Sequence, residues 1–208
     1  SETNGLSVLD TMELLYYSME QKGEKELAML AQEFRDHLFA YQQDKITIQS
    51  LLDHPVSHAF FHFFKSFPLK YTEEHIHLTG SLSPEFVYEH LKPILDGPHG
   101  AEVLKKVRQV YRQPQVSIGS SKDVHNLIAL KDHERFEEYL RILYLPKVIL
   151  TSREVHLKAA YHMARTLYHH YNVGTIRLKF TLSRASGSSE DQIPGMPELT
   201  EEDVLFGL

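Results

Sequence analysis

The chain has 208 residues, a length typical of one large domain or two small ones, and 42% of them are hydrophobic. This is enough apolar material to bury a core, so extended disorder is excluded. The 22 lysines and arginines against 28 aspartates and glutamates give a net charge of −6, which argues against duplex nucleic acid or an anionic membrane as a partner. Cysteine is absent, so a metal would have to use the 14 histidines or the carboxylates.

The sequence also bears on location. No apolar run is long enough to span a bilayer, and the first residues, SETNGLSVLD, lack the basic and apolar regions of a secretion signal. These features predict a soluble, cytoplasmic protein with no membrane partner.

The N-terminal third has a helical pattern. Apolar residues recur every three or four positions over residues 6–67, and Gly23 separates the first two helices. A third helix begins near Pro55 and ends before Pro68, because proline disfavours helix in the residue before it. Three of its histidines recur every four residues among phenylalanines, which we attribute to packing rather than to a metal-binding stripe. They are His54, His58 and His62. We expect residues 1–68 to form a helical N-terminal extension.

The first strand signal follows the extension. The stretch KYTEEHIHLTGS is rich in residues that suit a strand. Ser83 and Pro84 then look like the N-cap and first position of a helix that reaches about Leu95. Amphipathic patterns predict two more helices, over residues 101–111 and 133–144, with a loop after the first of them.

A long helix and a second strand come next. Thr151 and Glu154 have the spacing of a capping box, which would open a helix that ends near residues 172–174. The stretch TIRLKFTL alternates like a strand, and another helix is expected to start near Leu199. The order strand, helices, strand after residue 69 is typical of an α/β fold with parallel strands.

Two histidines at the end of the first predicted strand are candidate metal ligands. His75 and His77 lie two residues apart, so both side chains point to the same face of the strand and could share one ion. With 14 histidines in the chain, about one His-x-His pair is expected by chance, so the spacing alone carries little weight. The setting adds weight, because an α/β barrel places its reactive groups at the ends of its strands. The alternative is a pair of half-buried strand histidines with ordinary hydrogen bonds.

The residues around this pair resemble a known family. PLKYTEEHIHLTGSLSPEFVYEHL resembles the opening of the adenosine and AMP deaminases, which has a proline, a lysine, an acidic residue, His-x-His-Leu, a polar residue, Gly-Ser and a capped helix. Residues 136–180 resemble the next family segment, with a helix led by phenylalanine, a connection, a capped helix and the second barrel strand. Two separate matches in the correct order are much rarer by chance than either alone.

The resemblance implies a (β/α)₈ TIM-type barrel with one zinc ion at its mouth, held in part by His75 and His77. Zinc would activate water to attack the amino-bearing carbon of a purine nucleoside or nucleotide and release ammonia. Thr79, Phe136 and Leu140 would contact the substrate. Thr79 stands where nucleoside deaminases usually have an aspartate for the ribose hydroxyl, and Leu140 replaces a second aromatic residue of the apolar substrate wall. These departures leave the choice between adenosine, AMP and another substrate open.

An eight-stranded barrel needs roughly 250 residues, more than residues 69–208 supply. We therefore expect this region to be the first part of a deaminase-like barrel, about two strands and their helices, and to be truncated. The general acid and base and the remaining metal ligands would lie outside the chain, which alone should be inactive. The exposed edges should favour a homo-oligomer or binding of the missing part of the barrel.

Two alternatives stay open. One is another metal-dependent amidohydrolase, because His-x-His at the end of a first barrel strand also suits hydrolysis of amides or esters. The other is a non-catalytic helical interaction module, in which the extension serves dimerisation and the histidine pair has lost its role.

Overall fold

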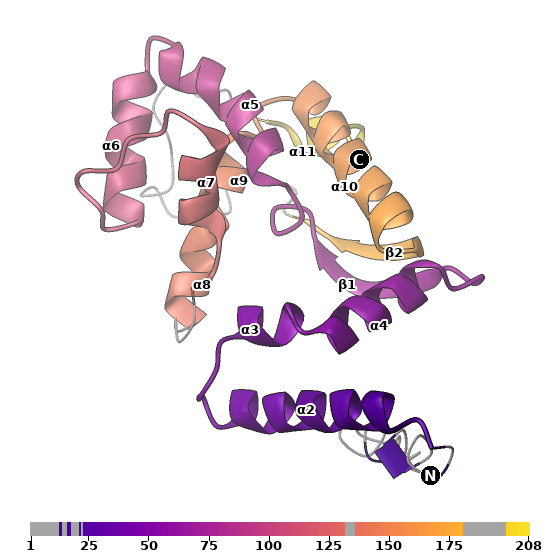
Figure 1. Cartoon of the computed structure of the whole chain (residues 1–208). Helices are drawn as coiled ribbons and strands as arrows, with labels where there is room; N and C mark the ends of the chain where they lie inside the picture. Colours follow the sequence, from indigo (N-terminus) through magenta and orange to yellow (C-terminus); the bar gives the residue numbers. More distant parts are fainter. Residues whose placement is uncertain (1–12, 14–15, 18–20, 22, 132–135, 181–198) are drawn as a thin grey trace. The chain divides into compact units, whose positions relative to one another are not determined.

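The computed structural model describes residues 13, 16–17, 21, 23–131, 136–180 and 199–208. The chain is mixed α/β and mostly helical, with two strands in one parallel sheet among these residues. It divides into two compact units, Ser1–Phe67 and Pro68–Leu208 (Figure 1). Of the helices described, none combines the length and the apolar character needed to cross a lipid bilayer.

The first unit is helical in its described residues. It contains α2 (Lys25–Gln42), α3 (Ile48–Leu52) and α4 (Pro55–Lys65), around a small core of Ala31, Phe34 and Leu51. The predicted third helix is confirmed as α4, which ends before Pro68. Packing accounts for only one of its three regularly spaced histidines, because His54 is buried whereas His58 and His62 are exposed.

His54 caps α4 with its side chain. Its Nδ1 accepts a hydrogen bond from the Val56 backbone N–H at 3.2 Å, so this nitrogen must carry no proton. The imidazole ring lies 5.1 Å from the Phe34 ring and 5.0 Å from the His37 ring, between centroids. Burial lowers the pKa of His54, charge on His37 lowers it further, and Glu33 opposes both effects. The site therefore favours the neutral imidazole.

We expect the first unit to lose stability as the pH falls. The pKa of folded His54 lies below its unfolded value of about 6.5, so the unfolded chain binds the proton first. The stabilisation is complete above the unfolded pKa and is lost as the pH falls toward the folded one. Urea unfolding followed by helical circular dichroism at about pH 7.5 and about pH 5.5 measures this loss. His54→Asn is the matched variant, because asparagine caps a helix without titrating. An equal pH dependence in the variant and the wild type would contradict the role given to His54.

The second unit contains the parallel sheet. β1 (Tyr71–His77) pairs with β2 (Val173–Lys179), and His77 lies opposite Lys179. The register shifts between Glu73 and Ile76. Neighbouring parallel strands need a long crossover, which here runs through all the helices from α5 to α10.

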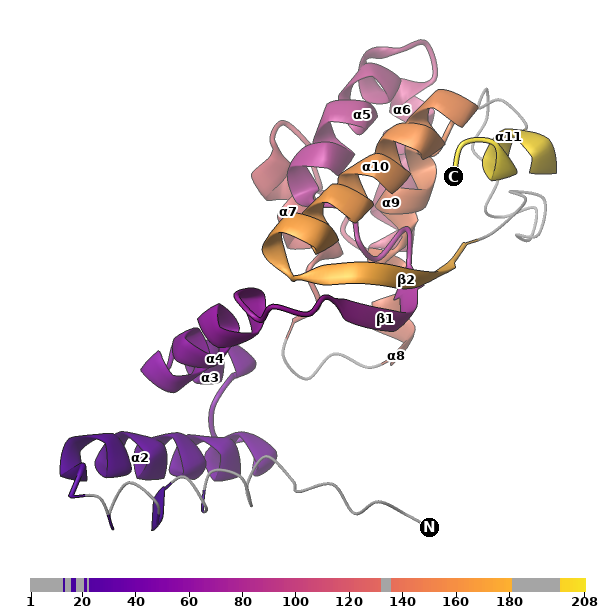
Figure 2. The ribbon, with the colours of Figure 1, turned by 90° about the vertical axis from the view of Figure 1, so that its right-hand side faces the viewer.

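Helices of the second unit lie over one side of this sheet. Figures 1 and 2 both show α5 (Pro84–Asp96), α6 (Gly100–Val110) and α10 (Arg153–His170) on the same side of the strands. The remaining helices are α7 (Ser121–Ile128), α8 (Phe136–Ile142), α9 (Tyr144–Val148) and α11 (Glu201–Leu205).

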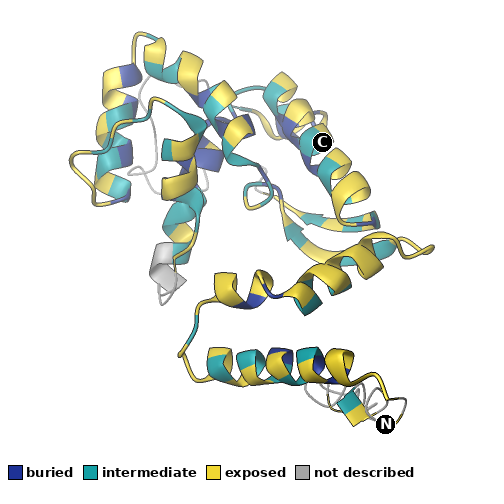
Figure 3. Ribbon diagram, viewed as in Figure 1, coloured by how far each residue is buried: buried dark blue, intermediate teal, exposed yellow. Residues whose placement is uncertain are grey.

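The main core lies among these helices and reaches the sheet. Val87 and Leu91 of α5 are fully buried, and Ile76 of β1 packs against the same cluster. Figure 3 shows buried positions on the inner sides of α5, α6 and α10. Because side chains alternate along a strand, an inward Ile76 leaves His75 and His77 on the opposite face, where both are exposed.

Serine side chains cap the two helices that flank the sheet. The predicted cap of α5 is confirmed, because Ser83 Oγ accepts a hydrogen bond from Phe86 N at 3.2 Å. For α10 the prediction is wrong by one residue: Ser152 Oγ, not Thr151, accepts from Val155 N, at 3.3 Å. Ser152 has the extended backbone that an N-cap requires, with φ −154° and ψ 165°.

Candidate metal site

His75 and His77 converge at the carboxyl end of β1. Their Nε2 atoms lie 3.0 Å apart, within hydrogen-bond distance, so that one ring can donate to the other, and the ring centroids lie 5.0 Å apart. Both side chains are on the face of the sheet that points away from the core, and both are exposed. The two imidazoles therefore present their nitrogen atoms to the same point on an open surface.

The spacing of these nitrogens fits two ligands of one zinc ion. With Zn–N bonds of about 2.0–2.1 Å, two nitrogens at tetrahedral corners lie about 3.3 Å apart, close to the 3.0 Å observed. Neutral imidazole is also a donor type that zinc prefers. In the part of the chain that the structure describes, no group of three or more His, Cys, Asp or Glu side chains is placed to hold a metal. Among the described residues the pair would supply two ligands, fewer than the three or more of a catalytic zinc site.

Neighbouring side chains fix the backbone that carries the pair. Glu73 Oε1 accepts a hydrogen bond from His75 N at 3.1 Å. Ser81 Oγ donates to the His77 carbonyl oxygen at 2.7 Å, which ties the turn after β1 back to the strand end. Leu78 is only 1% exposed and anchors this turn in the core. The histidines themselves are exposed, but their main chain is held on both sides.

The second strand adds charge to the same face of the sheet. Lys179 lies opposite His77 in the register, and Arg177 Nη1 lies 3.3 Å from Glu74 Oε2. The sequence alone does not predict this neighbourhood, because spacing along one strand does not give its register with another. The alternation in TIRLKFTL signalled only that the two cations share a face.

The other predicted site residues lie on two elements, the turn after β1 and helix α8. Thr79 is in the turn that follows β1 and is partly buried. Leu140 is on α8 and 53% exposed, and Phe136 begins that helix, although its side chain lies outside the described part of the structure. Just after α8, the Leu143 side chain is 3.8 Å from where a Cβ on Gly80 would lie. The end of α8 is therefore beside the turn that carries Thr79.

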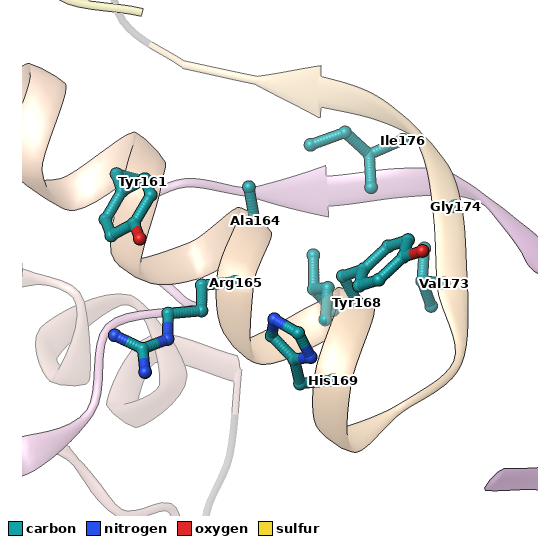
Figure 4. Close-up of a pocket in the computed structure, with 9 residues that line it drawn as sticks. Tyr161, Ala164, Arg165, Tyr168, His169, Val173, Gly174 and Ile176 are labelled. Atoms are coloured by element: carbon teal, nitrogen blue, oxygen red, sulfur yellow. The ribbon is translucent and has the colours of Figure 1, made fainter.

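A separate pocket of about 350 Å³ lies between α10 and the start of β2. Figure 4 shows Tyr161, Arg165, Tyr168 and His169 of α10 around it, with Ile176 of β2 beside them. Neither histidine of the pair lines this pocket, which opens at the other end of the strands.

Comparison with known proteins gave no relative: no protein-family model, no curated protein and no solved structure matched the chain. The function is therefore inferred from the geometry of the pair and from the resemblance in its sequence.

Proposed function

We propose that this chain is the N-terminal part of a zinc-dependent purine deaminase of the adenosine and AMP deaminase type. The observation that carries the proposal is the convergence of His75 Nε2 and His77 Nε2 to 3.0 Å at the carboxyl end of a strand in a parallel sheet. Enzymes built on (β/α)₈ barrels hold their reactive groups at that end. Residues 69–208 would begin such a barrel in the cytoplasm, and later strands would supply the missing ligands.

The open surfaces of the second unit support an unfinished barrel. Among the residues that the structure describes, each of the two strands has one edge without a further strand, which additional strands of a barrel would cover. Large side chains are exposed along α10: Leu157 is 56% exposed, Tyr161 65% and Tyr168 50%. Additional βα units, or a second copy of the chain, would remove these from water.

The residues of this chain would bind the zinc ion and orient the substrate. His75 and His77 would each offer a neutral imidazole nitrogen, and Glu73 and Ser81 would keep the strand end in place. When bound, zinc lowers the pKa of water from about 15.7 toward about 7, which supplies a nucleophile at neutral pH. In the overall hydrolysis, the water oxygen would bond to the amino-bearing purine carbon, a proton of that water would pass to the amino nitrogen, and the carbon–nitrogen bond would break to release ammonia. The neutral hydroxyl of Thr79 would face the sugar side of the substrate.

Ammonia release tests this proposal. Adenosine and AMP should be offered to the product of the complete gene and, separately, to residues 1–208. We expect zinc-dependent release from the former, lost on chelation and restored by zinc, and none at enzyme-like rates from the latter. Hydrolysis of amides or esters without deamination would contradict the proposal and favour the other amidohydrolase.

A helical interaction module is the second candidate, favoured by the surface of α4. Phe61, Phe63 and Phe64 are 47%, 58% and 50% exposed, and no residue of this helix is buried. Exposed aromatic side chains in such number mark association surfaces. A full-length protein with no stoichiometric zinc or other transition metal would favour this function over deamination.

A further inference from the structure

The outer side of α6 and the turn that follows it carry three cations. Val103 and Val107 are fully buried, which fixes the inner face of the helix. Lys105 and Arg108 lie three residues apart on the outer side. Arg112 lies just beyond the end of the helix, where its backbone is left-handed with φ 53°.

The three cations line one groove. Lys105, Arg108, Gln109, Arg112 and Pro114 surround a space of about 370 Å³. The chain after α6 folds back to form one wall, because the Arg108 Nε–H donates to the carbonyl oxygen of Val116 at 2.9 Å. This bond also holds the Arg108 guanidinium in place and leaves its two terminal nitrogens available. We call this space the α6 groove.

Local charge at the α6 groove is opposite to that of the chain as a whole. Residues 103–116 contain four lysines and arginines and no aspartate or glutamate, although the whole chain has a net charge of −6. Like charges three and four residues apart repel each other and destabilise a helix. The helix dipole offsets this for Arg108 in the last turn, but it does not account for Lys105 earlier in the helix. An anionic ligand would compensate all three charges.

We propose that the α6 groove binds a small anion that carries two or three linked phosphates. The guanidinium group of arginine can bind two phosphate oxygens at once, and three cations around one space match the charge of several linked phosphates. The net negative charge of the chain opposes nucleic acid. Both views show α6 away from β1, and the proposal does not depend on the histidine pair (Figures 1 and 2).

Calorimetric titration of the 208-residue chain with inorganic triphosphate tests this site. In about 50 mM salt without divalent metals we expect saturable binding of one triphosphate, weaker in about 200 mM salt because screening increases. Arg108→Gln with Arg112→Gln should weaken binding by at least about tenfold, since two charge-assisted contacts are lost. Inorganic phosphate should bind more weakly than triphosphate, because it reaches fewer cations.

The control removes the same charge elsewhere. Lys25→Gln with Lys45→Gln changes two exposed side chains of the first unit and should leave triphosphate affinity within about twofold. Unchanged circular dichroism confirms that both double variants fold. The proposal is overturned by an absence of saturable binding, by equal losses in the two double variants, or by tighter binding of a short DNA duplex than of triphosphate.

Discussion

Alanine at His75 or at His77 is expected to weaken zinc binding by the 208-residue chain by at least about tenfold. Each substitution leaves a single imidazole, whereas the wild-type nitrogens lie 3.0 Å apart, close enough to bind one ion together. Mutation of side chains that only hydrogen-bond to a metal ligand lowers metal affinity by about 10- to 100-fold. Removal of a ligand itself should lower the affinity by at least as much. Competition with a zinc-binding dye measures the affinity.

His125→Ala is the control for this pair. His125 is an exposed histidine on α7, remote in sequence from β1, and its removal should leave the affinity within about twofold. The double variant His75→Ala/His77→Ala should bind zinc no more tightly than the remaining surface histidines do. Equal zinc affinity in His75→Ala, His77→Ala and the wild type would show that the two rings do not act as ligands.

Leu91→Ala is expected to destabilise the second unit by about 2–5 kcal/mol, the usual range for a buried leucine truncated in a packed core. Leu91 is 0% exposed, and its helix α5 packs against α6, α7, α9 and α10. The lost methyl groups therefore leave a cavity at the junction of several helices, which cannot all move inward. Urea unfolding followed by near-ultraviolet circular dichroism reports the change through the tyrosines of this core.

The matched control is Leu157→Ala on α10. The same atoms are removed there, but the side chain is 56% exposed, so the change should be within about 0.5 kcal/mol. A cost at Leu157 equal to that at Leu91 would contradict the core assignment. A cost below about 1 kcal/mol at Leu91 would mean that the packing around α5 is loose.

Local sequence signals predicted the elements whose ends are marked by capping residues or prolines. Ser83 before a proline marked the start of α5, and Pro68 marked the end of the helical extension, because each acts on its immediate neighbours. The strand ending at His77 was predicted from composition and alternation over a few residues. All three predictions are confirmed by the observed bounds.

Two helices of the second unit were missed for different reasons. α7 has a cap signal that could have been used: Ser120 Oγ accepts from Asp123 N at 3.3 Å, and Val124 and Leu127 are buried. Only eight residues long, it was hidden by the loop-like residues before it. α9 has Pro146 within its five residues, where periodicity carries no information.

Much of the candidate site depends on contacts that one sequence cannot give. The face shared by His75 and His77 follows from alternation, but the position of Lys179 opposite His77 depends on strand register, which tertiary packing decides. The approach of Leu143 to the turn at Gly80 joins segments more than sixty residues apart. Neither contact has a local signature.

The most direct measurement of the central claim is zinc K-edge X-ray absorption of the 208-residue chain loaded with one equivalent of zinc. Two imidazole nitrogens at about 2.0–2.1 Å, with oxygen completing the coordination, are the result predicted for His75 and His77 acting on one ion. The imidazole signal should fall to one ring in His75→Ala. A zinc ion surrounded by oxygen alone, or an imidazole signal unchanged in that variant, would contradict the account.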